Sequence, residues 1–176
     1  MDKRQDILNA AERLFYANGF HATSTDVLCR EAGVSTRTFY RYFPSRDHLT
    51  EAVMDARQQR FFADLLPPDS PQAIPHLFAV LAHWMQAQGA EGCFFLKVWG
   101  EYAQQDARLS AHALDFRYGL RRYLSACIPV AAARDAVWMM FEGAITAGLI
   151  LGPDAAHQAA ATAALVLHHT GEDHEK

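Results

Sequence analysis

The short segment "TRTFYRYF", residues 36–43, alternates cationic and phenolic side chains with phenylalanines. At about 100° per residue on a helix, Phe39 and Phe43 share one face, while Arg37 and Arg41 lie on nearly the opposite face. The two tyrosines flank the arginine face. Guanidinium groups can donate to base edges and phenolic hydroxyls to phosphates, so this face suits a groove of double-stranded DNA. The alternative is an ordinary amphipathic helix with a solvated arginine face.

The flanking residues predict where this helix begins and ends. Ser35 is a suitable N-cap, and Pro44 cannot continue a helix, so the helix runs from Thr36 to Tyr42 or Phe43. A second short helix precedes it, over residues 25–31, with Ser24 as its N-cap and a glycine at residue 33 just past its end. A helix, a tight turn with glycine and a second helix form a helix-turn-helix, whose second helix enters the major groove.

A third, amphipathic helix is predicted upstream, in "DKRQDILNAAERLFYANGF", where Gly19 ends it. Its apolar face can pack against the other two helices. The expected shared core consists of Ile7, Leu14, Phe15, Leu28, Phe39 and Phe43.

With these motifs in order, the run "ILNAAERLFYANGFHATSTDVLCREAGVSTRTFYRYFPSRDHL" resembles the N-terminal domain of the TetR family of transcriptional regulators. The resemblance covers about the first 50 residues. Two departures are visible: Val27 stands where the family often has an acidic residue, and Arg46 replaces the usual lysine. The resemblance implies a DNA-binding domain at 1–48, with the helix-turn-helix at about 24–43, and an effector-binding and dimerisation domain at 49–176.

The resemblance also implies a homodimeric repressor that binds a palindromic operator in double-stranded DNA and is released by a small-molecule effector. Arg37 and Arg41 are the candidates to read bases, while the tyrosines, Thr25 and Arg46 would hold phosphates. The complete set of expected DNA contacts is Thr25, Thr36, Arg37, Thr38, Tyr40, Arg41, Tyr42 and Arg46, with Lys3 and Arg4 reaching the backbone or minor groove from a mobile arm.

Composition and charge agree with such a protein. The chain of 176 residues is 51% hydrophobic and 20% charged, which is typical of a globular protein. Residues 1–50 carry seven Lys and Arg against six Asp and Glu, and the remainder carries nine against fourteen, so the basic excess lies at the N-terminal end. No signal peptide is recognisable, and the most apolar run, 136–152, contains Glu142. A cytoplasmic protein without a membrane partner is expected.

Motifs for catalysis are not found in the sequence. It contains no nucleophile elbow, Gly-rich phosphate loop, metalloprotease helix or dinucleotide fingerprint, and its nine histidines match no standard ligand spacing. No metal or cofactor is therefore expected, and an enzyme that uses a helical cavity is only a remote alternative. A nearer alternative is a thiol-based regulator that senses oxidants or electrophiles through Cys93, which stands at a predicted helix start.

The chain after residue 45 reads as helical almost to its end. Helices are predicted at about 45–66, 72–92, 93–105, 107–128, 131–151 and 154–169, and "PPDSPQAIP" marks the first clear break. With the three N-terminal helices this gives about nine helices and no strand. An all-α fold is expected.

Large apolar side chains are dense in this second part of the sequence. Most must form ordinary core, but the resemblance implies a ligand cavity among the helices, and such cavities are commonly aromatic-lined with a few polar groups. The candidates are Trp84, Trp99, Tyr102, Phe116 and Trp138, with His83, Glu101 and Arg117 supplying polarity. This lining predicts an apolar or aromatic effector.

Small residues mark the last two predicted helices. They are Gly143, Ala144, Ala147, Gly148, Ala156, Ala160, Ala163 and Ala164, accompanied by Leu167. Either they pack closely within one subunit, or they pair with the same helices of a second copy, as the family resemblance implies. In the second case, Gly148→Leu or Ala147→Leu separates the subunits. A two-fold dimer places two recognition helices about 34–36 Å apart on DNA.

Overall fold

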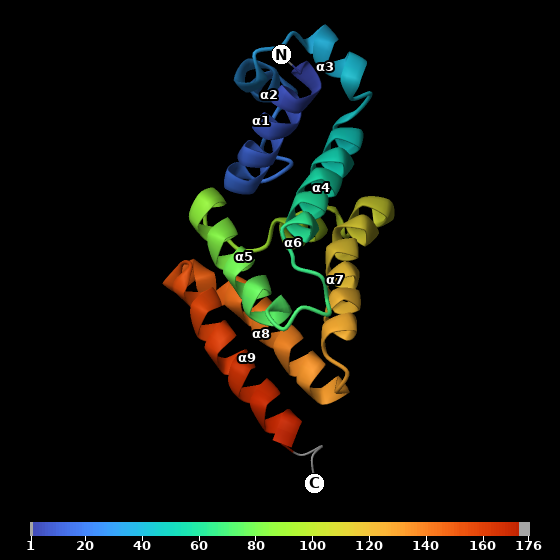
Figure 1. Ribbon diagram of the computed structural model, residues 1–176. Coiled ribbons are helices and arrows are strands. Elements are labelled where there is room, and N and C mark those ends of the chain that lie inside the picture. The colour runs from blue at the N-terminus through green and yellow to red at the C-terminus, as the bar shows by residue number, and fades with distance from the viewer. Residues whose placement is uncertain (1, 173–176) are drawn as a thin grey trace. The chain divides into compact units, whose positions relative to one another are not determined.

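The computed structural model describes residues 2–172, and within that range the chain forms nine α-helices and no strand (Figure 1). The prediction of an all-α fold is confirmed. The helices are α1 Lys3–Asn18, α2 Thr25–Ala32, α3 Thr36–Tyr42, α4 Arg46–Ala63, α5 Ala73–Gln88, α6 Phe94–Tyr102, α7 Ala107–Cys127, α8 Ala131–Leu151 and α9 Asp154–Glu172.

The helices divide into two compact units, and the division differs from the expected boundary at residue 48. The first unit contains the chain up to Arg60 together with Phe94–Phe116, and the second contains Phe61–Cys93 and the chain from Arg117 onward. An aromatic contact joins α6 to the N-terminal helices, while Arg108 and His112 of α7 contact Glu51 and Asp55 of α4. Phe94 packs edge-on against Phe20, with their ring centroids 5.3 Å apart. The core of the first unit is therefore completed by residues distant in sequence.

The first unit has the core that the sequence predicts. Ile7, Phe15, Leu28 and Phe39 are fully buried, and Phe43 is buried as well. Leu14 is only partly buried. Phe20, which is not among the expected core residues, is also fully buried.

Local signals set the ends of α2 and α3. The hydroxyl oxygens of Ser24 and Ser35 accept hydrogen bonds from the backbone N–H groups of Val27 (3.3 Å) and Thr38 (3.1 Å), which otherwise lack partners in the first turn of a helix. Gly33 ends α2 in the left-handed conformation, with φ of 62° and ψ of 39°. Ser24 therefore begins α2, and Gly33 and Ser35 make the tight turn from α2 into α3.

In the second unit, α8 packs along α9, and α5 packs along α9 as well (Figure 1). Aromatic rings fill its interior: the Phe61 ring lies 5.6 Å from the Trp84 ring and 6.0 Å from that of Phe141. Pro75 is accommodated in the first turn of α5, where its missing N–H costs no hydrogen bond. Among the residues described, the helices are all too short or too polar to cross a membrane.

Candidate functional site

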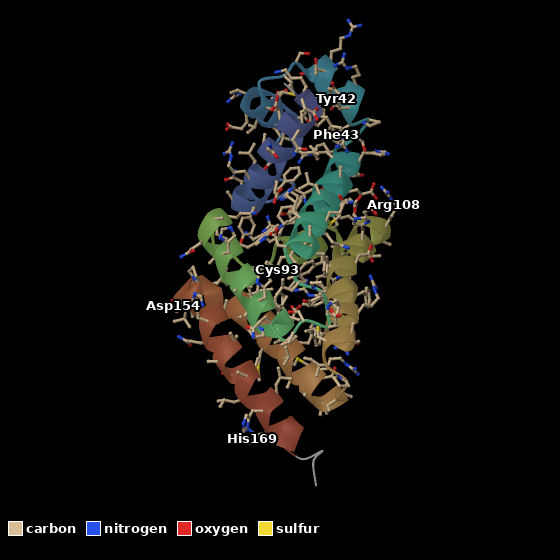
Figure 2. All side chains as sticks on the ribbon, in the orientation of Figure 1. Tyr42, Phe43, Cys93, Arg108, Asp154 and His169 are labelled. Carbon is tan, nitrogen blue, oxygen red and sulfur yellow. The ribbon has the colours of Figure 1, made fainter. Side chains whose placement is uncertain are left out.

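The recognition face expected on α3 is present in the structure. Arg37 and Arg41 are exposed and Tyr40 is 47% exposed, whereas Phe39 is fully buried and fixes the opposite side of the helix. Tyr42, the last residue of α3, is partly buried (labelled in Figure 2). The short helix thus turns cations and a phenolic group outward from an aromatic anchor.

Threonines border this face. Thr36, the first residue of α3, is exposed, and Thr38 is half-buried. The Ser35 hydroxyl donates to the Thr38 hydroxyl oxygen at 3.0 Å, which orients both groups at the start of α3. Thr25 is the first residue of α2 and is half-buried. All three stand near helix N-termini, where the partial positive charge of the helix favours phosphate.

One arginine of the face is folded back onto its neighbour. Arg41 donates to the Tyr42 hydroxyl at 3.3 Å, and its guanidinium lies 5.0 Å from the centre of the Tyr42 ring. This pairing orients the tyrosine hydroxyl and the arginine together.

Three of the expected DNA contacts need correction in their placement. The Arg46 guanidinium donates to the backbone carbonyl of Phe20 and lies 5.9 Å over the Phe15 ring, so it fastens the unit together instead of standing free for a phosphate. Lys3 and Arg4 are not on an extended arm, because they form the first turn of α1 behind the N-cap Asp2. The local signal for that cap, an aspartate before a helical pattern, was available in the sequence.

Two carboxylates join elements of the first unit, and neither role was expected from the sequence. Glu12 of α1 accepts from Arg57 at 2.6 Å and from Arg60 at 2.6 and 2.7 Å, both on α4. Glu101 of α6, expected to line a pocket, instead accepts from backbone N–H groups in the loop after α1. Burial disfavours the charge of Glu101, but hydrogen bonds from His21 and Phe20 outweigh it and hold the pKa of the carboxyl below its ordinary value.

The other expected pocket residues are divided between the two units. In the first unit, Tyr102 is buried against Phe20, Phe116 stacks on Phe95 at 4.6 Å, and Trp99 is 45% exposed. Trp84, Trp138, Arg117 and the exposed His83 belong to the second unit. Tyr102 and Phe116 are therefore core residues of the first unit, and the sequence pattern could not distinguish core aromatics from ligand-facing ones.

A polar cluster in the second unit brings Arg117 together with Glu142 and Cys93. The guanidinium donates to a Glu142 carboxylate oxygen at 2.6 Å and to the Cys93 sulfur at 3.5 Å. Burial disfavours the charge of Arg117, but Cys93 and Glu142 outweigh it and raise the pKa of the guanidinium. Two buried atoms on α8, the Trp138 Nε1 and the Glu142 Oε1, have no hydrogen-bond partner within the described chain.

The small residues of α8 and α9 separate into two sets. Ala144, Gly148, Ala156 and Ala163 are buried inside the second unit, which corrects the expectation that they face a second copy. A side chain at Gly148 would meet the Met85 Cε at 2.9 Å, so the glycine allows α5 to approach. Gly143, Ala147, Ala160, Ala164 and Leu167 keep exposed or partly exposed positions. Ala164 and Leu167 line an open groove of about 680 Å³ beside the proline-rich segment 68–75, which includes the start of α5.

Across the part of the chain that is described, no three or more His, Cys, Asp or Glu side chains are grouped so as to hold a metal ion.

The fold and the exposed face of α3 define a helix-turn-helix regulator. Residues 7–53 match the family described as bacterial regulatory proteins, tetR family. The N-terminal part of the chain is therefore similar to the DNA-binding domain of this family.

Individual proteins agree with this assignment. UidR, a helix-turn-helix transcriptional regulator of Escherichia coli, is 37% identical over 65 residues, which are 37% of this chain and 33% of UidR. The chain thus matches about a third of the length of such curated relatives. SCO4454, a TetR-family transcriptional regulator from Streptomyces coelicolor, has a TM-score of 0.83 at 24% identity over 95% of both chains.

A further solved structure shows the same fold with a small molecule. The multidrug binding protein EbrR, in complex with malachite green, has a TM-score of 0.73 at 19% identity, over 94% of this chain and 98% of EbrR. The matched proteins are regulators and not enzymes, so the enzyme alternative is set aside.

Proposed function

We propose that the protein is a homodimeric repressor that binds a palindromic operator through α3 and leaves it when a small apolar or aromatic effector binds. The observation that carries the proposal is the geometry of α3, whose arginines and Tyr40 are exposed over a buried phenylalanine. The phenylalanine fixes the helix, and the cations remain available to base edges.

The operator is sought by selecting duplexes from random-sequence DNA with the wild-type protein. Arg37→Ala should weaken binding to the selected duplex by about 1–3 kcal/mol and relax the preference at one base position. Arg122→Ala removes an exposed arginine of the second unit and is the matched control. Fluorescence anisotropy on selected and random duplexes measures both variants. Equal weakening on both duplexes by Arg37→Ala would contradict base reading by this residue.

The effector part of the proposal is supported by the second unit. EbrR has a related fold and was solved with malachite green, an observation about EbrR that motivates a similar role here. In this chain the buried Trp138 Nε1 and Glu142 Oε1 lack partners among the described residues, and an unsatisfied donor and acceptor suit a ligand with complementary polar groups. Arg117, on α7, contacts the same glutamate.

Malachite green itself is the probe for this part. If Trp138 faces the effector, the dye should quench tryptophan fluorescence and release the selected duplex, and Trp138→Phe should weaken both effects. His83→Ala, an exposed position on α5, is the control. Quenching that persists unchanged in Trp138→Phe would place the ligand elsewhere.

A second candidate function is regulation through the Cys93 thiol. Cys93 is partly exposed, directly precedes α6, and its sulfur accepts from the largely buried Arg117 guanidinium at 3.5 Å. The thiolate is the reactive form of a cysteine, and the guanidinium lies within hydrogen-bond distance of this sulfur. The thiolate would add to the β-carbon of an α,β-unsaturated carbonyl, forming an S–C bond while the α-carbon takes a proton from water.

N-Ethylmaleimide distinguishes this candidate from effector binding. The reagent should release the selected duplex from the wild type and not from Cys93→Ser, with mass spectrometry locating the adduct. Cys29→Ser is the control, because Cys29 is buried and its burial raises the pKa of the thiol. A full response retained in Cys93→Ser would end the idea.

A further inference from the structure

Two residues of α6 contact the end of α1, and both contacts lie within the first unit. Lys97 and Glu101 are four residues apart and so share one face of α6. The Lys97 ammonium donates to the carbonyl of Tyr16 at 2.7 Å and lies 4.7 Å from the centre of the Tyr16 ring. The last carbonyls of a helix lack partners within the helix and favour a cation, so this contact completes the end of α1.

Glu101 holds the chain just beyond that end. Its Oε1 accepts from the N–H of Phe20 at 2.8 Å, and its Oε2 accepts from the N–H of His21 at 2.7 Å. The imidazole Nδ1 of His21 is also 2.7 Å from Oε2. Gly19 allows the approach, because a Cβ there would lie 2.9 Å from Oε1. One carboxylate therefore fixes two consecutive peptide groups.

The same loop is held from α4 as well. Arg46 donates to the carbonyl of Phe20, while Glu101 accepts from its N–H, so Phe20 is fixed through both backbone groups. Its ring packs 4.7 Å from Phe15 of α1 and 5.3 Å from Phe94 of α6. The loop from Gly19 to Ser24 leads directly into α2, and α2 leads through Gly33 into α3. The position of this loop thus determines the direction in which α2 and α3 leave α1.

We propose that Lys97 and Glu101, the α6 clamp, are positioning residues for DNA recognition: they fix the α1–α2 loop and thereby hold α3 in the orientation that reads the operator. The inference rests on the proposed function and deepens it, because it names the contacts that hold the recognition helix in position. The clamp residues touch backbone and an imidazole inside the first unit, and they act through α3.

Loss of positioning has a signature different from loss of a DNA contact. Phosphate contacts supply affinity for any sequence, whereas base contacts need an accurately placed recognition helix. Glu101→Ala should weaken binding to the duplex selected by the wild type by about tenfold or more, and leave binding to random duplex nearly unchanged. Lys97→Met should act in the same direction. Glu101→Gln should give an intermediate effect, since its amide oxygen still accepts from one of the two N–H groups.

Amide hydrogen exchange reports on the clamp itself. In Glu101→Ala and Glu101→Gln the N–H groups of Phe20 and His21 should exchange faster, while circular dichroism stays helical. Gln104→Ala, an exposed position just beyond α6, should change neither exchange nor DNA binding. If Glu101→Ala is unfolded, Glu101→Gln and Lys97→Met carry the test.

The outcomes separate the clamp from the proposed function. Faster exchange of the two amides with unchanged affinity for the selected duplex would overturn the clamp as a positioning device. Equal weakening on selected and random duplexes would do the same. A wild-type protein that selects no duplex would instead overturn the proposed function, and the clamp's role in recognition would be lost with it.

Discussion

The buried carboxylate of Glu12 matters because it has two arginine partners. The side chains of Glu12 and Arg57 are only 12% and 10% exposed, and the Arg57 guanidinium also lies 5.1 Å from the centre of the Tyr16 ring. An ion pair in such surroundings adds little over an apolar pair, but removing one partner leaves a buried charge. Glu12 therefore joins α1 to α4 at a point where its removal is costly.

Glu12→Gln should destabilise the protein by about 3 kcal/mol, because the Arg57 charge loses its carboxylate. Urea unfolding followed by circular dichroism measures the free energy of unfolding. The control is Glu31→Gln, which breaks the exposed pair with Arg13 and should cost about 0.5 kcal/mol. Similar losses in the two variants would show that the Glu12 pair is effectively solvated.

The lowered pKa of Glu101 predicts how the free energy of unfolding depends on pH. Its pKa is held below the ordinary value of 4.5, so the folded state favours its ionised form and gains stability that is complete above that value. As pH falls through the lowered pKa this stability disappears. The difference in free energy of unfolding between wild type and Glu101→Gln should thus stay constant from neutral pH down to about 4.5 and shrink below it.

The pH measurement is repeated in His21→Ala, which removes the imidazole and leaves the two backbone N–H donors. If the plateau persists there, the amides account for the shift. A difference that instead begins to fall well above pH 4.5 would contradict a lowered pKa for Glu101.

These residue contacts also show the limit of sequence reasoning. The outward face of α3 followed from spacing alone, because Phe39 and the arginines lie within one short helix. Glu101 was expected to supply polarity to a pocket. Its true partners were missed because Phe20 and His21 stand about 80 residues away and contribute backbone N–H groups, which no side-chain pattern indicates. Arg46 was expected at a phosphate because it stands where the resembled family has a lysine, and its acceptor in the structure, the backbone carbonyl of Phe20, is not indicated by any sequence pattern.

At the scale of elements, helix ends were predicted well because caps and breakers are local. α3 ends at Tyr42 and α8 spans Ala131–Leu151, as the sequence predicts. α4 is shorter than expected and ends at Ala63. The membership of α6 and α7 in the first unit was not predictable, because it depends on contacts between segments that are distant in the sequence.

Two glycines at helix ends allow a matched test. Gly19 follows α1 with φ of 89° and ψ of 165°, and Gly33 follows α2 with φ of 62° and ψ of 39°. An alanine is strained at both positions, by about 1–3 kcal/mol. The space differs, because a Cβ at Gly19 lies 2.9 Å from Glu101 Oε1, whereas nothing lies within 4 Å at Gly33.

Gly19→Ala should therefore lose stability and also weaken binding to the selected duplex, since the new methyl group displaces the Glu101 carboxylate. Gly33→Ala should lose about 1 kcal/mol through strain alone, without faster exchange of the Phe20 and His21 amides. Urea unfolding and hydrogen exchange measure the two effects separately. Unchanged protection of these amides in Gly19→Ala would mean that Glu101 adapts to the methyl group.

At the scale of the whole molecule, an apolar surface on the last two helices supports the proposed dimer. Met139, Ile150 and Leu165 are 63%, 88% and 62% exposed. On α8, Met139, Gly143, Ala147 and Ile150 recur at helical spacing and share a face. Exposed apolar surface of this kind is typical of association sites. The buried small residues have a different role, because they allow α5, α8 and α9 to pack within one subunit.

This division changes which substitution tests assembly. Gly148→Leu would push against Met85 inside the subunit and so report on folding. Met139→Glu combined with Ile150→Glu adds charge to the exposed face, and two-fold symmetry places each charge twice in the interface. The double variant should be a folded, helical monomer by sedimentation and circular dichroism, and it should bind the selected duplex weakly because one recognition helix loses its partner. Tyr118→Glu, at an exposed position on α7, should remain dimeric. A double variant that stays dimeric and binds DNA normally would move the interface to another surface.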